Sequence, residues 1–204
     1  MDADFFSEFT KDLRRPDLWV KFQEYLQQKQ KSKGASHERG PIPPMPEVDG
    51  EWLFWEMMRI SRTPDPYIFP SLKKLRTSRQ FILAALSNTV IFPDGHEYNT
   101  DHRGVRSQFD VFISSAHSGL RKPDPRVYEL ALKEINVKAK TKGLQELVAS
   151  DIVFLDDIGE NLKAAKKFGM RTIKVNLGKT QDAVKELESY TGLQLLEDSD
   201  KARL

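Results

Sequence analysis

The sequence predicts an α/β fold, in which a parallel sheet covered by helices follows a smaller helical module. In the C-terminal two thirds, short apolar runs alternate with helical stretches, an order typical of a parallel sheet. The N-terminal third shows apolar residues at helical spacing only. With 204 residues, of which 39% are hydrophobic, the chain is long enough for one core domain and a modest additional module.

The composition excludes several classes of partner and site. Lys and Arg number 32 against 30 Asp and Glu, so no excess of charge indicates a nucleic acid or a membrane surface. The absence of cysteine excludes disulfides, thiolate metal sites and cysteine nucleophiles. No apolar run approaches the roughly 18 residues that span a bilayer. We expect a cytoplasmic protein; the ending Ala202-Arg203-Leu204 resembles a peroxisomal address and leaves import into peroxisomes as the alternative.

Residues 1–65 predict a partial helical module. Apolar residues recur at helical spacing from Ala3 to about Lys31, with a break at Arg15-Pro16, which predicts two helices. The segment 31–49 is polar and then proline-rich, a composition typical of a loop. The following run EWLFWEMMRI is dense in aromatic residues and methionine, and we expect it to be a helix with a buried face.

Residues 66–204 predict the α/β core. A helix is expected over about 67–77. Four apolar runs then read as strands, at residues 81–86, 109–113, 152–155 and 172–175. Ligands of open α/β sheets bind at the carboxyl ends of the strands, so polar residues that directly follow these runs are the first candidates for a site.

Two of these strand ends offer groups that suit a phosphate. Ser87 and Asn88 follow the run FILAAL, and a hydroxyl and an amide can hold a phosphate oxygen. Lys122 lies in HSGLRKPDPRVY, beyond the next run, and can neutralise the charge of the phosphate. Taken alone, Ser87 and Asn88 could equally form a turn or a helix N-cap, and Lys122 could be an exposed charge beside a helix start.

The third strand end carries an acidic pair. Asp156 and Asp157 follow the run IVFL, and adjacent carboxylates can hold a hard cation such as Mg²⁺. They could instead form the acidic start of a helix, which the helix dipole favours. Asn161 lies four residues beyond Asp157, on the same face of that helix, where it can orient the carboxylate or act as a cap.

Taken in order, these residues resemble the haloacid dehalogenase superfamily. The phrases SNT, GLRKPDPRVYELAL, DIVFLDDIGENLKAAKKFGMRTIKV and VKELESYTGLQLL are most similar to the amino-terminal phosphatase domain of soluble epoxide hydrolase and its relatives. The likeness covers roughly residues 66–196, and its longest phrase is specific. The resemblance implies a Rossmann-like sheet for 66–204 and a cap role for 1–65.

The resemblance also implies a role for each candidate residue. Ser87, Asn88 and Lys122 would contact the transferring phosphate of a small phosphorylated molecule, and Lys122 would also stabilise the nucleophile. Asp157 would ligate Mg²⁺, with Asp156 and Asn161 completing or orienting the acidic site. No catalytic nucleophile is among these residues.

Relatives begin with an apolar strand that ends in Asp-x-Asp, which supplies the nucleophile and the general acid and base. This chain shows no such strand. Asp2 and Asp4 have the spacing, but no apolar run precedes them, and they read as an acidic helix start. The absent strand would lie at the centre of the sheet, between the strands that end at Ser87 and Asp156. Truncation is favoured over a strand from a partner chain or a sheet that has closed differently.

Three functions follow from this pattern. The first is a Mg²⁺-dependent phosphatase lineage that acts on a small organic phosphate, inactive in this chain because the nucleophile is missing. The second is a non-catalytic binding or regulatory module that retains the anion pocket. The third is haloacid dehalogenation, against which the pair Asp156 and Asp157 argues, because that reaction normally lacks a metal-binding acidic pair.

Overall fold

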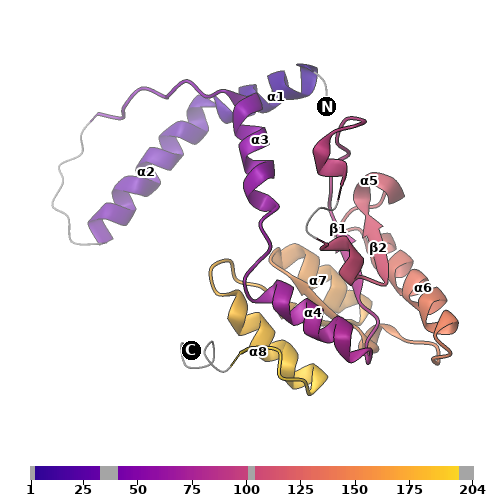
Figure 1. Cartoon of the computed structure of the whole chain (residues 1–204). Coiled ribbons are helices and arrows are strands. Elements are labelled where there is room, and N and C mark those ends of the chain that lie inside the picture. Colours follow the sequence, from indigo (N-terminus) through magenta and orange to yellow (C-terminus); the bar gives the residue numbers. More distant parts are fainter. Residues whose placement is uncertain (1–2, 33–40, 101–103, 198–204) are drawn as a thin grey trace. The chain divides into compact units, whose positions relative to one another are not determined.

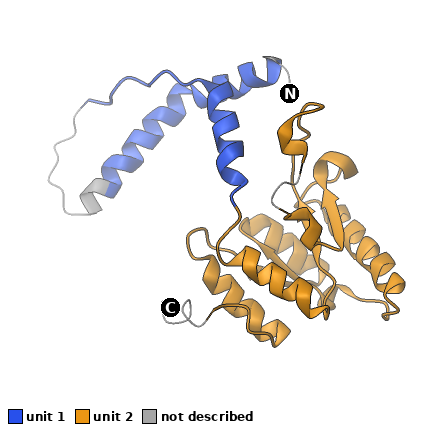
Figure 2. Ribbon diagram, in the orientation of Figure 1, with its two compact units in different colours: residues 1–63 blue, residues 64–204 orange. Residues whose placement is uncertain are grey.

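The computed structural model describes residues 3–32, 41–100 and 104–197 (Figure 1). The chain divides into two compact units, Met1–Thr63 and Pro64–Leu204 (Figure 2). The division falls beside the boundary predicted between residues 65 and 66. The predicted terminal tripeptide signal and Asp2 lie outside the described residues. No helix in the part that the structure describes is long and apolar enough to cross a membrane.

Unit 1 contains the three helices expected from its periodicity. They are α1 (Ala3–Leu13), α2 (Pro16–Ser32) and α3 (Gly50–Ser61). Pro16 opens α2, where its fixed φ suits the first turn and its missing N–H costs nothing. Of the predicted loop, residues 33–40 lie outside the described part, and residues 41–49 form neither helix nor strand. Asp49 caps α3 by accepting a hydrogen bond from the Trp52 backbone N–H at 2.9 Å.

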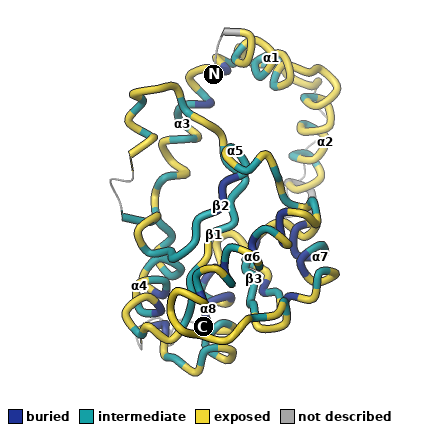
Figure 3. The backbone as a smooth tube through the Cα atoms, turned by 90° about the vertical axis from the view of Figure 1, so that its right-hand side faces the viewer, coloured by how far each residue is buried: buried dark blue, intermediate teal, exposed yellow. Residues whose placement is uncertain are grey.

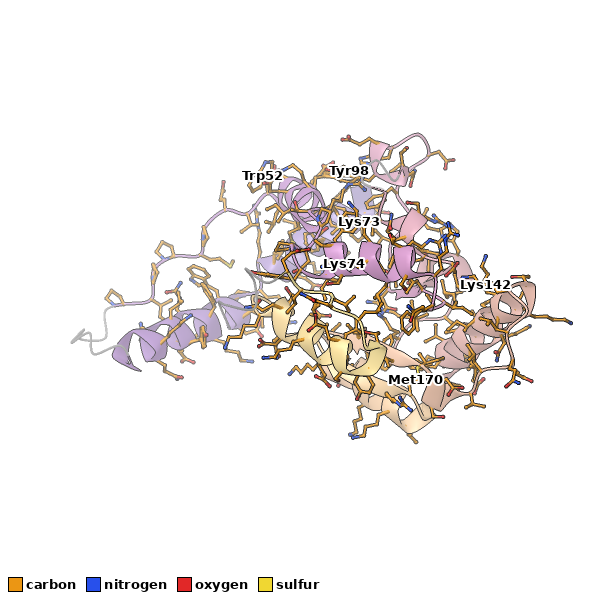
Figure 4. All side chains as sticks on the ribbon, turned by 60° about the horizontal axis from the view of Figure 1, so that its bottom comes forward. Trp52, Lys73, Lys74, Tyr98, Lys142 and Met170 are labelled. Carbon is orange, nitrogen blue, oxygen red and sulfur yellow. The ribbon has the colours of Figure 1, made fainter. Side chains whose placement is uncertain are left out.

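A cluster of aromatic rings joins α1 to α3. The buried Phe54 ring meets those of Phe5, Phe6 and Phe9 edge-on, with centroids 5.2, 5.7 and 5.9 Å away, a favourable arrangement for aromatic pairs. The prediction that the segment EWLFWEMMRI, which lies in α3, buries an apolar face is only partly right, because other apolar side chains of α3 are exposed. Large apolar side chains of α3 that stay exposed are Trp52 (labelled in Figure 4), Met57 and Ile60.

Unit 2 alternates helices and strands as predicted, although each strand is only four residues long. Its strands are β1 (Ala84–Ser87), β2 (Val111–Ser114), β3 (Val153–Asp156) and β4 (Arg171–Lys174). Its helices are α4 (Ile68–Ser78), the single turn α5 (Ser115–Ser118), α6 (Pro125–Thr141), α7 (Gly159–Phe168) and α8 (Thr180–Thr191).

The strands form two parallel pairs rather than one continuous sheet. β1 pairs with β2, with Leu86 opposite Ile113, and β3 pairs with β4, with Leu155 opposite Ile173. Within the described residues, no strand joins β1 to β3. The position of an absent central strand, which the resemblance implies, stays a prediction.

Helices hold the two sheets together. α6 packs on β1 and β2, α7 packs on β3 and β4, and the two helices contact each other. Between them lies a cluster of buried side chains, against which Leu86 of β1 and Phe154 of β3 both pack; its members are Val127, Tyr128, Ala165 and Met170 (Met170 is labelled in Figure 4). A second cluster forms where α4 meets α8, around Leu75 and Val184. In Figure 3 buried stretches lie on β2 and α7, whereas α2 is mostly exposed.

Tyr128 is the largest fully buried side chain of this first cluster, and its removal is expected to be costly. Its ring lies edge-on to that of Phe154, and its hydroxyl donates to the Asn161 carbonyl oxygen at 2.9 Å. Burial, and then the negative charge of Asp156, raise the pKa of Tyr128 to about 12, so the phenol stays a donor.

We expect Tyr128→Ala to lower the free energy of unfolding by about 3 to 5 kcal/mol, because it leaves a large cavity. Tyr128→Phe removes only the hydroxyl and should cost about 1 kcal/mol. Urea denaturation followed by circular dichroism measures both. Equal losses in the two variants would show that the hydrogen bond, and not the packing of the ring, stabilises this junction.

Candidate functional site

The predicted site residues lie at the carboxyl ends of β1 and β3 and in the loop that follows β2. Ser87 ends β1 and Asn88 follows it, while Asp156 ends β3 and Asp157 follows it. Lys122 lies between α5 and α6, and its peptide bond to Pro123 is cis. Hydrogen bonds bring some of these residues into direct contact, and leave others available.

The side-chain amide of Asn88 makes two hydrogen bonds to the backbone of Lys122. It donates from Nδ2 to the Lys122 carbonyl oxygen at 3.1 Å, and its Oδ1 accepts from the Lys122 backbone N–H at 3.0 Å. Each polar atom of the amide makes one of these two bonds, which tie the loop to the end of β1, and each retains capacity for a second hydrogen bond. Asn88 therefore positions Lys122, and the phosphate contact that the resemblance implies stays a prediction.

Lys122 in turn reaches the end of the other sheet. Its Nζ lies 2.7 Å from Asp156 Oδ2, and the two side chains are only 11% and 4% exposed. The ammonium group also lies 5.5 Å from the centre of the Phe154 ring, within range of a cation–π interaction. This buried ion pair connects the two sheets at their carboxyl ends.

Asp156 accepts two further hydrogen bonds. The Ile158 backbone N–H and the Asn161 side-chain amide donate to its Oδ1, at 2.8 and 3.0 Å. Burial alone would raise the pKa of the Asp156 carboxyl, but the hydrogen bonds from Lys122, Ile158 and Asn161 together lower it below its usual value. The helical spacing singled out Asp157 as the partner of Asn161, and the contact is instead to Asp156.

Ser87 and Asp157 remain available to a ligand. The Ser87 hydroxyl is half-buried and the Asp157 carboxylate is exposed. Neither side chain makes a hydrogen bond to another residue in the described parts of unit 2. A hydroxyl donor and a free carboxylate, together with the Lys122 ammonium group, are the kinds of group that suit an anion carrying a hard cation.

The donors fit a Mg²⁺ ion only in part. Across residues 3–32, 41–100 and 104–197, no group of three or more His, Asp or Glu side chains lies close enough to hold a metal. Mg²⁺ in proteins is often held by one or two carboxylates, with water and substrate phosphate completing its shell. Asp157 can supply one such ligand, whereas the oxygens of Asp156 are engaged by Lys122, Ile158 and Asn161.

Sequence reasoning missed a group of hydroxyl side chains beside this site. Thr89, Ser114 and Ser115 lie at the carboxyl ends of β1 and β2; Thr89 is hydrogen-bonded to both serines, and His117 Nδ1 contacts the Ser114 hydroxyl. The run SSAHS directly follows a predicted strand, so the rule that singled out Ser87 could have found them. The contact of the Tyr128 hydroxyl with α7 could not be predicted in this way, because helical periodicity shows that a residue is buried but not which neighbouring helix it contacts.

Comparisons with known proteins agree with the resemblance seen in the sequence. No protein-family model matches the chain. It is 42% identical over 90 residues to acyl-CoA dehydrogenase family member 10 of Mus musculus, and 39% identical over 93 residues to bifunctional epoxide hydrolase 2 of Sus scrofa. It is also 31% identical over 107 residues to a sesquiterpene phosphatase of Aspergillus oryzae. These matches support the resemblance of the sequence motifs to the haloacid dehalogenase superfamily.

These matches cover part of each protein. They span 44%, 46% and 52% of this chain, and 7%, 15% and 48% of the three relatives, in the same order. The chain therefore spans less than two thirds of the length of each relative.

Proposed function

We propose that this chain derives from a Mg²⁺-dependent phosphatase that acts on a small organic phosphate, and that it binds such a phosphate without hydrolysing it. The observation that carries the proposal is the Lys122–Asp156 ion pair, with Asn88, the residue after Ser87, bonded to the Lys122 backbone and with Asp157 exposed next to Asp156. The name of the Aspergillus oryzae relative, a phosphatase, supports the same substrate class.

Each residue has a defined task in this proposal. The Ser87 hydroxyl donates to a phosphate oxygen, and Lys122 offsets the negative charge while Asn88 fixes its backbone. A bound Mg²⁺ would polarise the phosphoryl group, and Asp157 is the carboxylate that would hold it. Asn161 and the Ile158 N–H keep the Asp156 carboxylate oriented towards Lys122.

Neither Asp156 nor Asp4 is placed to act as a nucleophile, and this proposal assigns Asp157 to Mg²⁺. Asp156 is buried and paired with Lys122. Asp4 lies in the first turn of α1 rather than at the end of a strand, as the sequence predicted for an acidic helix start. Loss of a catalytic nucleophile can cost on the order of 10⁶ in rate. We therefore propose a site that binds phosphate and does not form a phosphoryl-enzyme.

Titration with inorganic phosphate in the presence of Mg²⁺, followed by calorimetry, tests the binding. We expect Ser87→Ala to weaken binding about tenfold, because one hydrogen bond to a charged ligand is lost. Ser189→Ala, which removes a hydroxyl bonded to the Glu186 carbonyl on α8, is the matched control and should bind as the unmodified chain does. Equal affinity in Ser87→Ala and the unmodified chain would contradict the proposed pocket.

The same proteins with p-nitrophenyl phosphate and Mg²⁺ test the absence of turnover. We expect no hydrolysis above that of buffer. Hydrolysis that disappears in Asp157→Ala would show instead that this chain is itself an enzyme. Phosphate binding without hydrolysis also fits the second candidate, a non-catalytic binding or regulatory module, which the full engagement of Asp156 favours.

A further inference from the structure

A chain of hydroxyl groups runs from the end of β1 to an exposed histidine. Thr89 Oγ1 lies 2.5 Å from Ser114 Oγ, and Ser114 Oγ lies 3.1 Å from His117 Nδ1. Ser114 is buried, Thr89 is half-buried and His117 is exposed. The imidazole can therefore exchange protons with water while its Nδ1 contacts a buried hydroxyl.

Further hydrogen bonds fix the geometry of this chain. The Thr89 backbone N–H donates to Ser115 Oγ at 2.9 Å, and the Ser115 hydroxyl donates to the Thr89 carbonyl oxygen at 3.2 Å. The Ser118 hydroxyl donates to the Ser114 carbonyl oxygen at 2.9 Å. Because both ends are held by their backbone, Thr89 and Ser114 can change the direction of their hydrogen bond without moving apart.

The protonation state of the imidazole sets that direction. When His117 is neutral and its Nδ1 is an acceptor, the Ser114 hydroxyl donates a hydrogen bond to Nδ1. Ser114 Oγ then accepts from the Thr89 hydroxyl, which cannot donate to a ligand at the same time. A protonated His117 donates from Nδ1 to Ser114 Oγ. The Ser114 hydroxyl then donates to Thr89 Oγ1, and the Thr89 hydroxyl becomes free to donate a hydrogen bond to a ligand.

We propose that Thr89, Ser114 and His117 form a proton-dependent relay that positions a hydroxyl donor for an anion bound at the end of β1. Thr89 is the second residue after Ser87, and Asn88 between them holds Lys122. Protonation of His117 adds a donor to this group, and anion affinity rises with it. The inference rests on the proposed phosphate pocket, and Ser114 and His117 act in it as positioning residues.

Other charged groups lie around the imidazole. His117 and Ser114 line a hollow of about 550 Å³ between β2 and α6, together with Asp110, Glu134 and Lys138. Asp110 is paired with Arg76 at 2.6 Å and with Lys142 at 3.2 Å. Neither Glu134 nor Lys138 takes part in the relay, and both remain present in the variants that test it.

The first test measures the hydrogen-bond directions in the relay by NMR, without any ligand. Imidazole nitrogen NMR shifts at about pH 8 should show the Nε2–H tautomer of His117, with Nδ1 as the acceptor. The resonances of Thr89 should change with pH together with those of His117, and Ser114→Ala should abolish that coupling. An Nδ1–H tautomer, or Thr89 resonances that do not follow His117, would overturn the relay.

The second test uses sulfate, which stays a dianion while an imidazole changes charge between about pH 8 and pH 5. Over that range sulfate should bind the unmodified chain about tenfold more tightly at the acidic end, because one charge-assisted hydrogen bond is gained. His117→Asn should lose this pH dependence. His96→Asn is the matched control, since His96 accepts from the Tyr98 backbone N–H outside the relay, and it should retain the dependence.

The two tests separate the two proposals. If the unmodified chain binds no sulfate at either pH, the phosphate pocket fails, whatever the tautomer of His117. If sulfate binds with the same pH dependence in His117→Asn as in the unmodified chain, the relay fails and the pocket stands.

Discussion

A fusion that places an apolar strand ending in Asp-x-Asp ahead of Met1 is expected to gain stability and phosphatase activity together. β1 and β3 each pair with one other strand, and both pack against the same cluster between α6 and α7. At their carboxyl ends, Asn88 after β1 bonds to the Lys122 backbone, and Lys122 pairs with Asp156 of β3. We propose that a parallel strand between them would complete one sheet of five strands and bring its carboxylates to Ser87 and Lys122.

The expected gains are large. About five apolar side chains of such a strand, at roughly 2 kcal/mol each, contribute up to about 10 kcal/mol to the free energy of unfolding. A nucleophile placed beside the retained groups is worth on the order of 10⁶ in rate. Urea denaturation and hydrolysis of p-nitrophenyl phosphate with Mg²⁺ measure the two effects, and amide hydrogen exchange shows whether β1 and β3 become protected.

Two control fusions separate folding from chemistry. The same strand ending in Asn-x-Asn should stabilise the chain equally and give no hydrolysis. A segment of equal length with polar residues in place of the apolar ones should do neither. If the Asp-x-Asp fusion leaves the amides of β1 and β3 as exchangeable as before, no strand has entered between them, and the proposed arrangement of the sheet is wrong.

Removing one member of the Lys122–Asp156 pair is expected to have the next largest effect. Asp156→Ala leaves the Lys122 ammonium buried without its partner, and we expect a loss of about 3 to 5 kcal/mol in the free energy of unfolding. Lys122→Met/Asp156→Leu replaces both charges by apolar groups of similar size and should recover most of that loss. A double variant as unstable as Asp156→Ala would show that the hydrogen bonds to Ile158 and Asn161, rather than the ion pair, dominate.

The pH dependence of stability gives an independent check of this pair. Because the pKa of Asp156 is lowered in the folded chain, its contribution is fully present above the carboxyl pKa of the unfolded chain. That contribution is lost as the pH falls through the lower folded-state value. The difference in melting temperature between the unmodified chain and Asp156→Asn should therefore shrink in acid. The exposed pair of Asp124 and Arg126 is the control, and Arg126→Ala should leave the melting temperature nearly unchanged.

Periodicity and strand-end polarity predicted much of this fold from the sequence. The break at Pro16 and the four short apolar runs marked helix and strand positions to within about three residues, because backbone propensity and burial are local properties. What failed was partner assignment. Asn161 lies at helical spacing from Asp157 and yet bonds to Asp156. The Asp156 carboxylate, at the end of β3, points towards the first turn of α7, where Asn161 donates to it. Nor could spacing reveal that Asn88 uses both polar atoms of its amide on Lys122.

The two short sheets also affect how the protein can be handled. A strand edge with unpaired backbone N–H and C=O groups is a template for strands of other chains, and natural sheets protect such edges by covering, bulging or charging them. Within the described residues, β1 and β3 carry apolar side chains beside edges that no other strand pairs. We expect self-association through these edges to compete with correct folding, so that protein concentration, as well as temperature, determines how long the chain stays in solution.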